Sequence, residues 1–434
     1  MASFRKKIMA KIRKPYHYLV PYLSARRYKY PSNKLIVIGI TGTKGKTTVA
    51  NMLWHILEAA GFKTGLLGTA NIKISDHEEL NTYHMTMLGQ GLIQKYLNDM
   101  VNAGCKYAIV ETTSEGIKQW RHKAINYDVA VFTNLYPEHI EAHGSWVKYR
   151  NAKGNLFNSL KHLKHKQIEG KTISKIILAN ADDPEFKYFS KFWADQKFSF
   201  GLKQPVDYQA KDIVLNPFSS DFKIGENSYY LSLPGEFNVI NALTAVAIAQ
   251  ALEINVLDCQ KGISNIKNIP GRMEKISFGK NGSVFVDYAH EEQSFRAALK
   301  AVLKIKEEQG GKIIVLMGAA GNRDKIKRLT MAQAANEMAD LIVVSNEDPY
   351  DEDPQTIVDQ ISDNLKKLGC EENVKFFKIF DRREGINKAV SLAEEKDVVL
   401  IIGKGAEQCI VAKGEKIPWD DRQVVREEIK KIYG

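Results

Sequence analysis

The segment from Gly42 to Thr48 has the residue types and spacing of a phosphate-binding loop. It follows the apolar run 35–40 directly and precedes a stretch of helical periodicity, although Ile40 replaces the first glycine of the strict motif. Backbone N–H groups of such a loop surround phosphate oxygens, the following helix N-terminus adds positive potential, and a lysine reaches the terminal phosphates. We therefore predict an ATP site at Gly42, Thr43, Lys44, Gly45, Lys46, Thr47 and Thr48, with Thr47 as a ligand of Mg²⁺.

Buried strands must position this loop. Short apolar runs, each ending in polar or glycine residues, alternate with helical stretches at 35–40, 107–110, 129–132, 176–178, 284–286, 313–317, 341–344 and 398–402. This pattern is typical of a parallel sheet covered by helices on both faces, with ligands at the carboxyl ends of the strands. The predicted fold is α/β: a P-loop central ATPase domain with a mostly parallel sheet, plus a smaller doubly wound, Rossmann-like C-terminal domain.

We place the domain boundary at Pro270-Gly271, after a helical stretch at 238–251 and before a new series of strands. The predicted organisation is a basic amphipathic N-terminal segment at 1–34, a central ATP-binding domain at 35–270 and a C-terminal domain at 271–434. The length of 434 residues is sufficient for two or three such domains.

Further motifs follow in a fixed order. They are Thr-Asn at 133–134, Glu-His-Ile-Glu-Ala-His-Gly at 138–144, Tyr-Arg-Asn-Ala-Lys at 149–153, Leu-Pro-Gly-Glu-Phe-Asn at 233–238, Pro-Gly-Arg-Met-Glu at 270–274, Asp-Tyr-Ala-His at 287–290, Gly-Lys-Gly at 403–405 and Asp-Asp-Arg at 420–422. Over residues 35–434 this order resembles the Mur ligases, in particular the type E branch (UDP-N-acetylmuramoyl-tripeptide synthetases). The resemblance implies an ATP-dependent, ADP-forming ligase of peptidoglycan biosynthesis that joins a carboxylate, activated as an acyl phosphate, to an amino group.

The chemistry of the matching residues fits that activity. Amide formation needs a better leaving group on the carboxylate, and phosphoryl transfer depends mainly on positioning and charge neutralisation. By the resemblance, the catalytic residues are Lys46, Glu111, His139 and Lys153. The implied metal ligands are Thr47, Glu111, His139 and Lys153, the last as a carbamate formed with CO₂. Neighbouring cations lower the pKa of a lysine and so favour the neutral amine that carbamylation requires.

The resemblance also implies three sets of binding residues. Further ATP contacts are Asn134, Asn241, Arg272 and Asp287, and acceptor contacts are Thr86, Ser114 and Arg121. The amino-acid substrate would contact Arg328, Glu347, Asp348, Tyr350, Gly403 and Glu407. The implied cofactors are ATP and Mg²⁺, and the implied partners are a peptide or nucleotide-sugar precursor and a free amino acid.

Three features depart from the type E pattern. Only the basic segment 1–34 stands where these ligases carry a UDP-binding domain, which puts UDP recognition in doubt. Glu115 replaces the histidine of the family's Ser-Ser-His-Gly-Leu motif. Tyr350 stands where diaminopimelate-adding enzymes carry an arginine, and a phenol cannot pair with the distal carboxylate of that donor. We therefore expect another donor, with lysine or ornithine as first choice.

Several functions remain open at this point. A pseudomurein peptide ligase, or a Mur-like ligase acting on a non-UDP or lipid-linked peptide, would use the same motifs. A folylpolyglutamate synthetase fits the C-terminal motifs poorly. A non-catalytic P-loop scaffold would need the phosphate loop, but not Glu111, His139, Lys153 and Arg272 together.

The positive charge of the chain is concentrated at its N-terminus. The sequence has a net charge of +11, but residues 1–34 hold ten Lys or Arg and no Asp or Glu, which leaves 52 basic against 51 acidic residues in the rest. The basic composition is therefore no argument for nucleic acid binding. An apolar stripe runs through the same segment at Phe4, Ile8, Ile12, Tyr16, Leu19 and Leu23, with Pro15 and Pro21 expected to break it into short pieces.

Two interpretations of this segment stay open: a helix packed on the protein's own surface, or peripheral contact with an anionic membrane. No apolar run reaches the roughly 18–20 residues of a spanning helix, and no signal peptide is evident. The four cysteines lie far apart, which favours a reducing cytoplasm. We expect a cytoplasmic monomer, located at the inner face of the membrane if the second interpretation holds.

Overall fold

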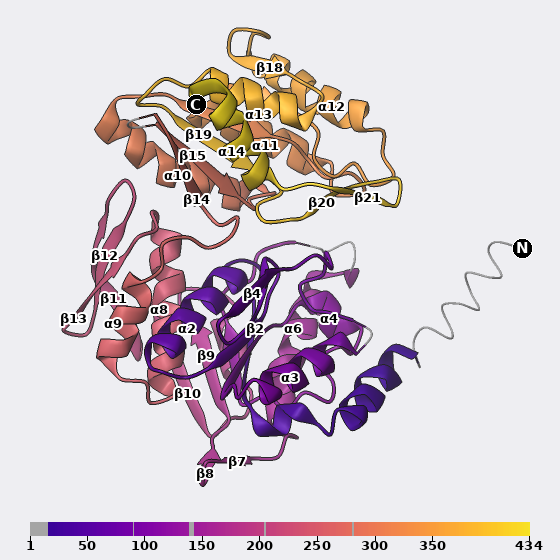
Figure 1. The fold of residues 1–434 in the computed structure, drawn as a ribbon, viewed down its shortest axis with the longest axis vertical. Coiled ribbons are helices and arrows are strands. Elements are labelled where there is room, and N and C mark those ends of the chain that lie inside the picture. Colours follow the sequence, from indigo (N-terminus) through magenta and orange to yellow (C-terminus); the bar gives the residue numbers. More distant parts are fainter. Residues whose placement is uncertain (1–15, 90, 139–142, 204, 280–281) are drawn as a thin grey trace, which may run out of the picture. The chain divides into compact units, whose positions relative to one another are not determined.

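The computed structural model describes residues 16–89, 91–138, 143–203, 205–279 and 282–434. Within them, the strand before the phosphate loop is central in a sheet of eleven strands (Figure 1). Their order is β13 (Asn227–Leu231), β12 (Ser220–Ile224), β11 (Tyr208–Leu215), β10 (Gln196–Gly201), β9 (Ile176–Asn180), β6 (Val129–Phe132), β1 (Ile36–Thr41), β5 (Tyr107–Glu111), β2 (Thr64–Leu67), β3 (Asn71–Ile74) and β4 (His77–Leu80). From β10 to β2 the strands are parallel, and β3 and β4 extend the edge as an antiparallel pair.

Helices cover both faces of this sheet. On one face, α3 (Leu92–Asn102), α6 (Trp146–Leu160) and α7 (Phe186–Ser190) pack against β1, β5 and β6 in a single apolar cluster. On the other face, α2 (Lys46–Ala59) contacts β1, β2 and β5 and packs on α9 (Val256–Ser264). Further elements are η1 (Pro31–Lys34), α4 (Ser114–Lys118), α8 (Glu236–Ala251) and the small hairpin of β7 (Lys166–Ile168) and β8 (Lys171–Ile173). Burial on both faces explains why the sequence of β1 is apolar throughout.

The chain divides into two compact units. The first runs to Ile213 and includes Phe222–Tyr230 and Val239–Ile266, and the second contains Val214–Asp221, Leu231–Asn238 and Lys267–Gly434. The contact-based division thus assigns two short segments before residue 239 to the second unit. Our boundary at Pro270-Gly271 stays a prediction about the domain limits.

The second unit is built on a smaller sheet. The order of its described strands is β14 (Glu274–Phe278), β15 (Gly282–Asp287), β19 (Val398–Ile402), β16 (Ile313–Met317), β17 (Leu341–Val344) and β18 (Phe376–Lys378). All pair in parallel except β14, which is antiparallel to β15. Between β19 and the last helix lies a hairpin of β20 (Cys409–Ala412) and β21 (Glu415–Pro418).

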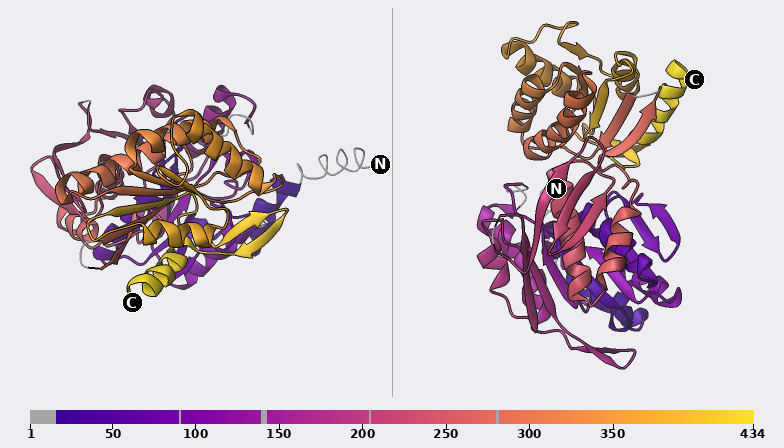
Figure 2. Two further views of the ribbon diagram at one scale, coloured as in Figure 1. Left: turned by 90° about the horizontal axis from the view of Figure 1, so that it is seen from above. Right: turned by 90° about the vertical axis from the view of Figure 1, so that its left-hand side faces the viewer.

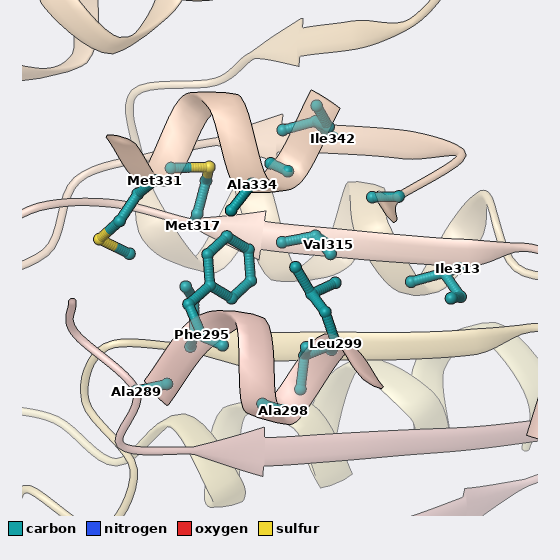
Figure 3. Packing of buried hydrophobic residues seen from close by; sticks show 14 of the residues in the cluster. Ala289, Phe295, Ala298, Leu299, Ile313, Val315, Met317, Met331, Ala334 and Ile342 are labelled. Carbon is teal, nitrogen blue, oxygen red and sulfur yellow. The ribbon is translucent and has the colours of Figure 1, made fainter. Parts of the chain in front are cut away.

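Helices flank both faces of this sheet in the view from above (Figure 2), and a separate apolar core lies on each face. One lies beneath α10 (Glu292–Gln309), α11 (Ile326–Met338) and α12 (Pro354–Lys367), and the other beneath α13 (Arg382–Ser391) and α14 (Asp421–Tyr433). In Figure 3, Phe295 and Leu299 of α10 point towards Val315 of β16. The neighbouring Ile314 and Leu316 belong to the opposite core, so β16 is apolar along its whole length. The predicted doubly wound α/β fold is confirmed.

Residues 16–27 form a helix whose apolar residues are largely exposed. The described part of the predicted stripe, Tyr16, Leu19 and Leu23, is 50%, 51% and 63% exposed, whereas Pro21 and Ala25 are buried. The predicted break at Pro21 is wrong, because the helix continues through this residue and buries its ring. Residues 1–15, with the other half of the stripe, lie outside the described residues. In the described part of the chain, no helix is long and apolar enough to cross a bilayer.

Candidate active site

The phosphate loop joins β1 to α2, and its path requires two glycines. Gly42 and Gly45 have φ angles of 153° and 83°. A side chain on Gly42 would overlap the hydroxyl of Thr133, and one on Gly45 would overlap the side-chain oxygen of Asn241 on α8. The loop therefore packs too closely for any other residue at these two positions. Helix α2 begins at Lys46, so its N-terminus directly follows the loop.

The Thr-Asn motif after β6 holds the loop in place. Asn134 accepts hydrogen bonds from the N–H of Thr43 through its backbone oxygen (2.9 Å) and from the N–H of Lys44 through Oδ1 (2.8 Å). The hydroxyl of Thr133 donates to the carbonyl of Lys44 (2.7 Å). Asn134 and Asn241 both lie at the loop, and their predicted contact with the nucleotide stays a prediction.

Lys46 lies over the loop that it belongs to. Its ammonium donates to the carbonyl oxygens of Gly42 (3.0 Å) and Thr43 (2.9 Å). Binding of a nucleotide would bring phosphate oxygens within reach of the same group, since the side chain is only partly buried. The ammonium of Lys44 lies 3.3 Å from the carboxylate of Glu138, and Thr48 is buried in the first turn of α2.

Lys153, on helix α6, also contacts the phosphate loop. It is 2% exposed and donates to the carbonyl of Gly42 (2.7 Å) beside the ring of Tyr149. Burial, and then the positive charge of Lys46, hold the pKa of Lys153 well below its ordinary value of 10.5. A neutral amine is the form that reacts with CO₂, so this environment fits the predicted carbamylation.

Glu111 lies at the carboxyl end of β5 and contacts both Thr47 of the phosphate loop and Thr69 in the turn after β2. Its buried carboxylate accepts hydrogen bonds from the hydroxyl of Thr47 (3.1 Å), the hydroxyl of Thr69 (2.9 Å) and the N–H of Thr69 (2.9 Å). A carboxylate and a hydroxyl at this separation are hard oxygen ligands of the kind that Mg²⁺ uses alongside phosphate and water. The sequence analysis missed Thr69, although its position just beyond the carboxyl end of β2 could have indicated it.

His139 cannot be placed in this arrangement, because it lies outside the described residues. Among the residues that are described, no group of three or more His, Cys, Asp or Glu side chains could hold a metal ion. A metal at Thr47 and Glu111 would therefore take further ligands from bound phosphate, from water, from a carbamate on Lys153 or from the undescribed segment.

Of the predicted acceptor residues, Thr86 is connected to Glu111 through Thr69, whereas Ser114 and Arg121 have other partners. The hydroxyl of Thr86 lies 2.9 Å from the hydroxyl of Thr69, which itself donates to Glu111. The hydroxyl of Ser114 lies 3.1 Å from Nε2 of His143, whose pKa is lowered by burial. Arg121 donates to the carbonyl of Met87 (2.5 Å) and to the side chain of Gln119 (2.5 Å), and burial lowers its pKa. Their contact with an acceptor stays a prediction.

In the second unit, the motifs at 270–274, 287–290 and 403–405 converge at the carboxyl ends of β15 and β19. The carboxylate of Asp287 accepts hydrogen bonds from the N–H groups of Met273 (2.7 Å) and Ala289 (2.8 Å). The guanidinium of Arg272 lies over the ring of Tyr288, 4.4 Å from its centre. Gly271 has a φ of 60°, and a side chain there would overlap the backbone at 405–406.

A second cluster in this unit contains most of the residues predicted to bind the amino acid. The ammonium of Lys404 is fully buried and lies 2.8 Å from Asp348 and 2.7 Å from Glu407. Glu347 packs against Gly403, whose φ is 109°. Sequence reasoning did not foresee that Lys404 would be the partner of both carboxylates.

Tyr350 and Arg328 differ from this cluster in their surroundings. The backbone of Tyr350 pairs with β20 through Val411 (3.0 Å), and the guanidinium of Arg323 lies 5.3 Å from the centre of the Tyr350 ring. Arg328 is 2% exposed and forms an ion pair with Glu352 (2.8 Å). Its predicted contact with substrate is untested and would require this ion pair to open.

Glu347→Gln is expected to stabilise the protein at pH 8. Burial raises the pKa of Glu347 from 4.5 to about 7, so the folded state keeps a proton that the unfolded chain releases near pH 4.5. The protonated group contributes fully to stability below pH 4.5, and this contribution is lost as the pH rises through 7. The whole pKa shift corresponds to a loss of about 3 kcal/mol in the free energy of unfolding. Urea unfolding should give nearly equal stabilities at pH 4.5 and a more stable variant at pH 8. A difference that does not vary with pH would contradict this assignment.

Comparisons with known proteins identify the class of enzyme. Residues 40–249 match the Mur ligase middle domain, and residues 271–405 match the Mur ligase glutamate ligase domain. The P-loop unit and the doubly wound unit thus correspond to the two domains of a family of ATP-dependent ligases. The chain belongs to the Mur ligase family.

Relatives are similar over nearly the whole chain. The UDP-N-acetylmuramoyl-L-alanyl-D-glutamate–2,6-diaminopimelate ligase of Geobacillus thermodenitrificans is 34% identical over 409 residues, covering 93% of this chain and 80% of that protein. The UDP-N-acetylmuramyl-tripeptide synthetase of a Roseiflexus species is 32% identical, covering 95% and 82%. A solved structure of a UDP-N-acetylmuramoyl-L-alanyl-D-glutamate–2,6-diaminopimelate ligase superposes with a TM-score of 0.62 and 26% identity, covering 92% and 79%. The resemblance inferred from the motifs is confirmed.

Proposed function

We propose that this ligase adds an amino acid to a muramyl-peptide-like cell-wall precursor, in the manner of the type E Mur ligases. The observation that carries the proposal is the convergence of two groups on the phosphate loop. Glu111 reaches it through Thr47 (3.1 Å), and the buried Lys153 reaches it through the carbonyl of Gly42 (2.7 Å). A nucleotide-binding scaffold without catalysis has no need of a carboxylate and a low-pKa lysine at these positions.

In the proposed reaction, the γ-phosphoryl group of ATP passes to the acceptor carboxylate, and the amino group of the donor then displaces phosphate. The loop N–H groups and Lys46 orient and neutralise the phosphates. Thr47 and Glu111 would hold Mg²⁺, which supplies further charge neutralisation when bound. Ser114 and Arg121 would orient the acceptor, with Arg121 able to pair with a carboxylate or phosphate.

An amino-acid-by-acceptor matrix tests this function. Phosphate release and product mass would be measured for muramyl-dipeptide acceptors with UDP, with a lipid diphosphate, or with neither, and for pseudomurein-type peptides. Phosphate release that depends on both substrates supports a ligase, and the productive acceptor separates the murein, lipid-linked and pseudomurein alternatives. ATP binding without release in any combination would support a scaffold instead.

We predict that the donor is a basic diamino acid, with lysine or ornithine preferred over meso-diaminopimelate. The carboxylates of Asp348 and Glu407, which both contact the ammonium of Lys404, would attract a distal ammonium. Tyr350 cannot neutralise a distal carboxylate. The matrix measures the preference directly, and preferential incorporation of diaminopimelate would show the prediction wrong.

Two variants sharpen that comparison. Tyr350→Arg should raise kcat/KM for diaminopimelate relative to lysine, because it supplies the missing cation. Arg323 lies beside Tyr350 and is the competing source of positive charge. The wild-type enzyme could prove to use diaminopimelate. If Arg323→Ala then abolishes ligation of diaminopimelate but not of lysine, Arg323 is the cation that pairs with the distal carboxylate.

We further propose that residues 1–30 bind an anionic membrane peripherally, on the cytoplasmic side. The helix at 16–27 exposes Tyr16, Leu19 and Leu23 and ends in exposed Arg26 and Arg27. An aromatic and aliphatic face beside unopposed cations fits a headgroup surface, where each cation contributes about 1 kcal/mol.

The same helix docks next to the predicted acceptor residues. The ring of Tyr18 lies edge-on to that of Trp120 (6.0 Å), which precedes Arg121, and the hydroxyl of Ser24 donates to the carbonyl of Gly91 (3.2 Å). An acceptor presented at the membrane would therefore meet the site beside this helix.

Co-sedimentation with vesicles tests the membrane proposal. Full-length protein should bind vesicles rich in anionic lipid at low salt, release at high salt, and bind neutral vesicles weakly. A Tyr16, Leu19 and Leu23 to serine variant should lose binding and keep ATP affinity, as should deletion of 1–30. Light scattering tests the proposed monomer. Failure to bind anionic vesicles at low salt, or a dimer that the serine variant abolishes, would assign the exposed face to another role.

A further inference from the structure

A pair of buried asparagines links the phosphate-loop helix to the edge of the sheet. Asn51, one turn after Thr47 on α2, donates to Oδ1 of Asn71 (3.1 Å), and Asn71 donates back to Oδ1 of Asn51 (2.8 Å). Both residues are 1% exposed or less. The remaining amide hydrogens are also satisfied, because Asn51 donates to the carbonyl of Thr47 (2.9 Å) and Asn71 donates to Glu78 (2.6 Å).

Each asparagine also holds one of the two residues that donate to Glu111. Asn51 fixes the carbonyl of Thr47, whose hydroxyl contacts Glu111. The backbone carbonyl of Asn71 accepts a hydrogen bond from the N–H of Gly68 (3.1 Å), and this bond closes the turn that presents Thr69 to Glu111. The turn lies so near the carboxylate that a side chain on Gly68 would come within 2.6 Å of it.

We infer that Asn51 and Asn71 are positioning residues that set the separation between Thr47 and Thr69, and thereby the direction in which Glu111 points. The amide pair and the Glu111 carboxylate are two bridges between the same two elements, α2 and the turn after β2. With the pair intact, the carboxylate is held by three donors before any ligand arrives, so metal and phosphate meet a preorganised oxygen. Groups that orient a metal ligand in this way typically change metal affinity 10–100-fold when they are removed.

The hydrogen-bond network extends away from the site to Glu78 and Lys73, and these contacts set the orientation of the Asn71 amide. The carboxylate of Glu78 accepts from Asn71 and lies 3.2 Å from the buried ammonium of Lys73, which in turn lies over the ring of Trp54. This ion pair fixes which end of the Asn71 amide faces Glu78. The oxygen of Asn71 is therefore left to accept from Asn51. The inference rests on the proposed function, since it assigns Thr47 and Glu111 to the nucleotide–metal site.

The test compares Asn51→Leu and Asn71→Leu with Trp54→Phe. Trp54 also links α2 to the sheet, but its indole donates to the carbonyl of Thr64 (3.0 Å) and not to Thr47 or to the turn at 68–69. The Mg²⁺ concentration for half-maximal binding of a fluorescent ATP analogue, the melting temperature without nucleotide, and kcat and KM would be measured for each variant. Asn51→Ser and Asn71→Ser replace the leucine variants if those do not fold.

Both asparagine variants should raise the half-maximal Mg²⁺ concentration about tenfold or more and lower kcat, whereas Trp54→Phe should lower the melting temperature alone. Asn51→Ser, which keeps a hydroxyl near Thr47, should recover part of the Mg²⁺ response. If the asparagine variants only melt earlier, like Trp54→Phe, the pair is structural and the inference is overturned. If wild-type protein shows no Mg²⁺-dependent nucleotide binding at all, the proposed function fails instead.

Discussion

Lys46→Ala is expected to reduce ligation by at least about 10²–10³-fold, the loss typical of removing one preorganised charge-stabilising group. Its ammonium now donates to the carbonyls of Gly42 and Thr43, within the loop where the β- and γ-phosphates would lie. Without this cation, the charge that develops during phosphoryl transfer is left to the loop N–H groups and the metal. Phosphate release at saturating substrates measures the effect.

The matched control for this variant is Lys44→Ala. Lys44 lies in the same loop, but its ammonium contacts Glu138. Lys44→Ala removes one cation of the loop but leaves Lys46 to contact the phosphates. This variant should therefore lose much less activity than Lys46→Ala. Because Lys46 is only partly buried, its removal should leave the melting temperature of the free protein nearly unchanged. Turnover at the wild-type rate in Lys46→Ala would remove the ATP-dependent mechanism from consideration.

Lys153→Ala is expected to abolish ligation, with a loss of at least about 10²-fold, and to recover part of the activity when formate or acetate is added. If Lys153 is carbamylated, the alanine variant lacks a carboxylate ligand that a small carboxylate can replace. Chloride at the same ionic strength is the control. Lys153→Arg should be inactive and not rescued, because it keeps a cation and fills the space.

Lys153 also predicts a dependence on CO₂ and pH. The lowered pKa leaves more neutral amine at a given pH than an exposed lysine would have, and acidification protonates the amine and so opposes carbamate formation. Removal of bicarbonate should therefore lower wild-type activity, more so at lower pH, and added bicarbonate should restore it. Carbon-13 NMR with labelled bicarbonate should show a carbamate signal that is missing from Lys153→Ala. An active, nucleotide-bound enzyme without that signal would contradict carbamylation.

The sequence alone determined the parts of the site that are contiguous in the chain. The phosphate loop could be predicted because its glycines, lysines and threonines are neighbours, and the strands that carry the motifs could be predicted because burial on both faces makes them apolar throughout. The ordered motifs were sufficient for the family. They also placed Glu111 at the end of a strand, at the edge where ligands bind in such sheets.

Only the tertiary structure decided which distant side chains meet. The contacts of Glu111 with Thr47 and Thr69, and of Lys404 with Asp348 and Glu407, depend on strand order and on the directions of side chains that are far apart in the sequence.

The N-terminal helix shows the same limit. Helical periodicity identified Tyr16, Leu19 and Leu23 as one face, but a periodic stripe does not say which face is buried. The packing buries Pro21 and Ala25 instead and leaves the stripe exposed, because the burial of a surface helix is decided by the surface that receives it.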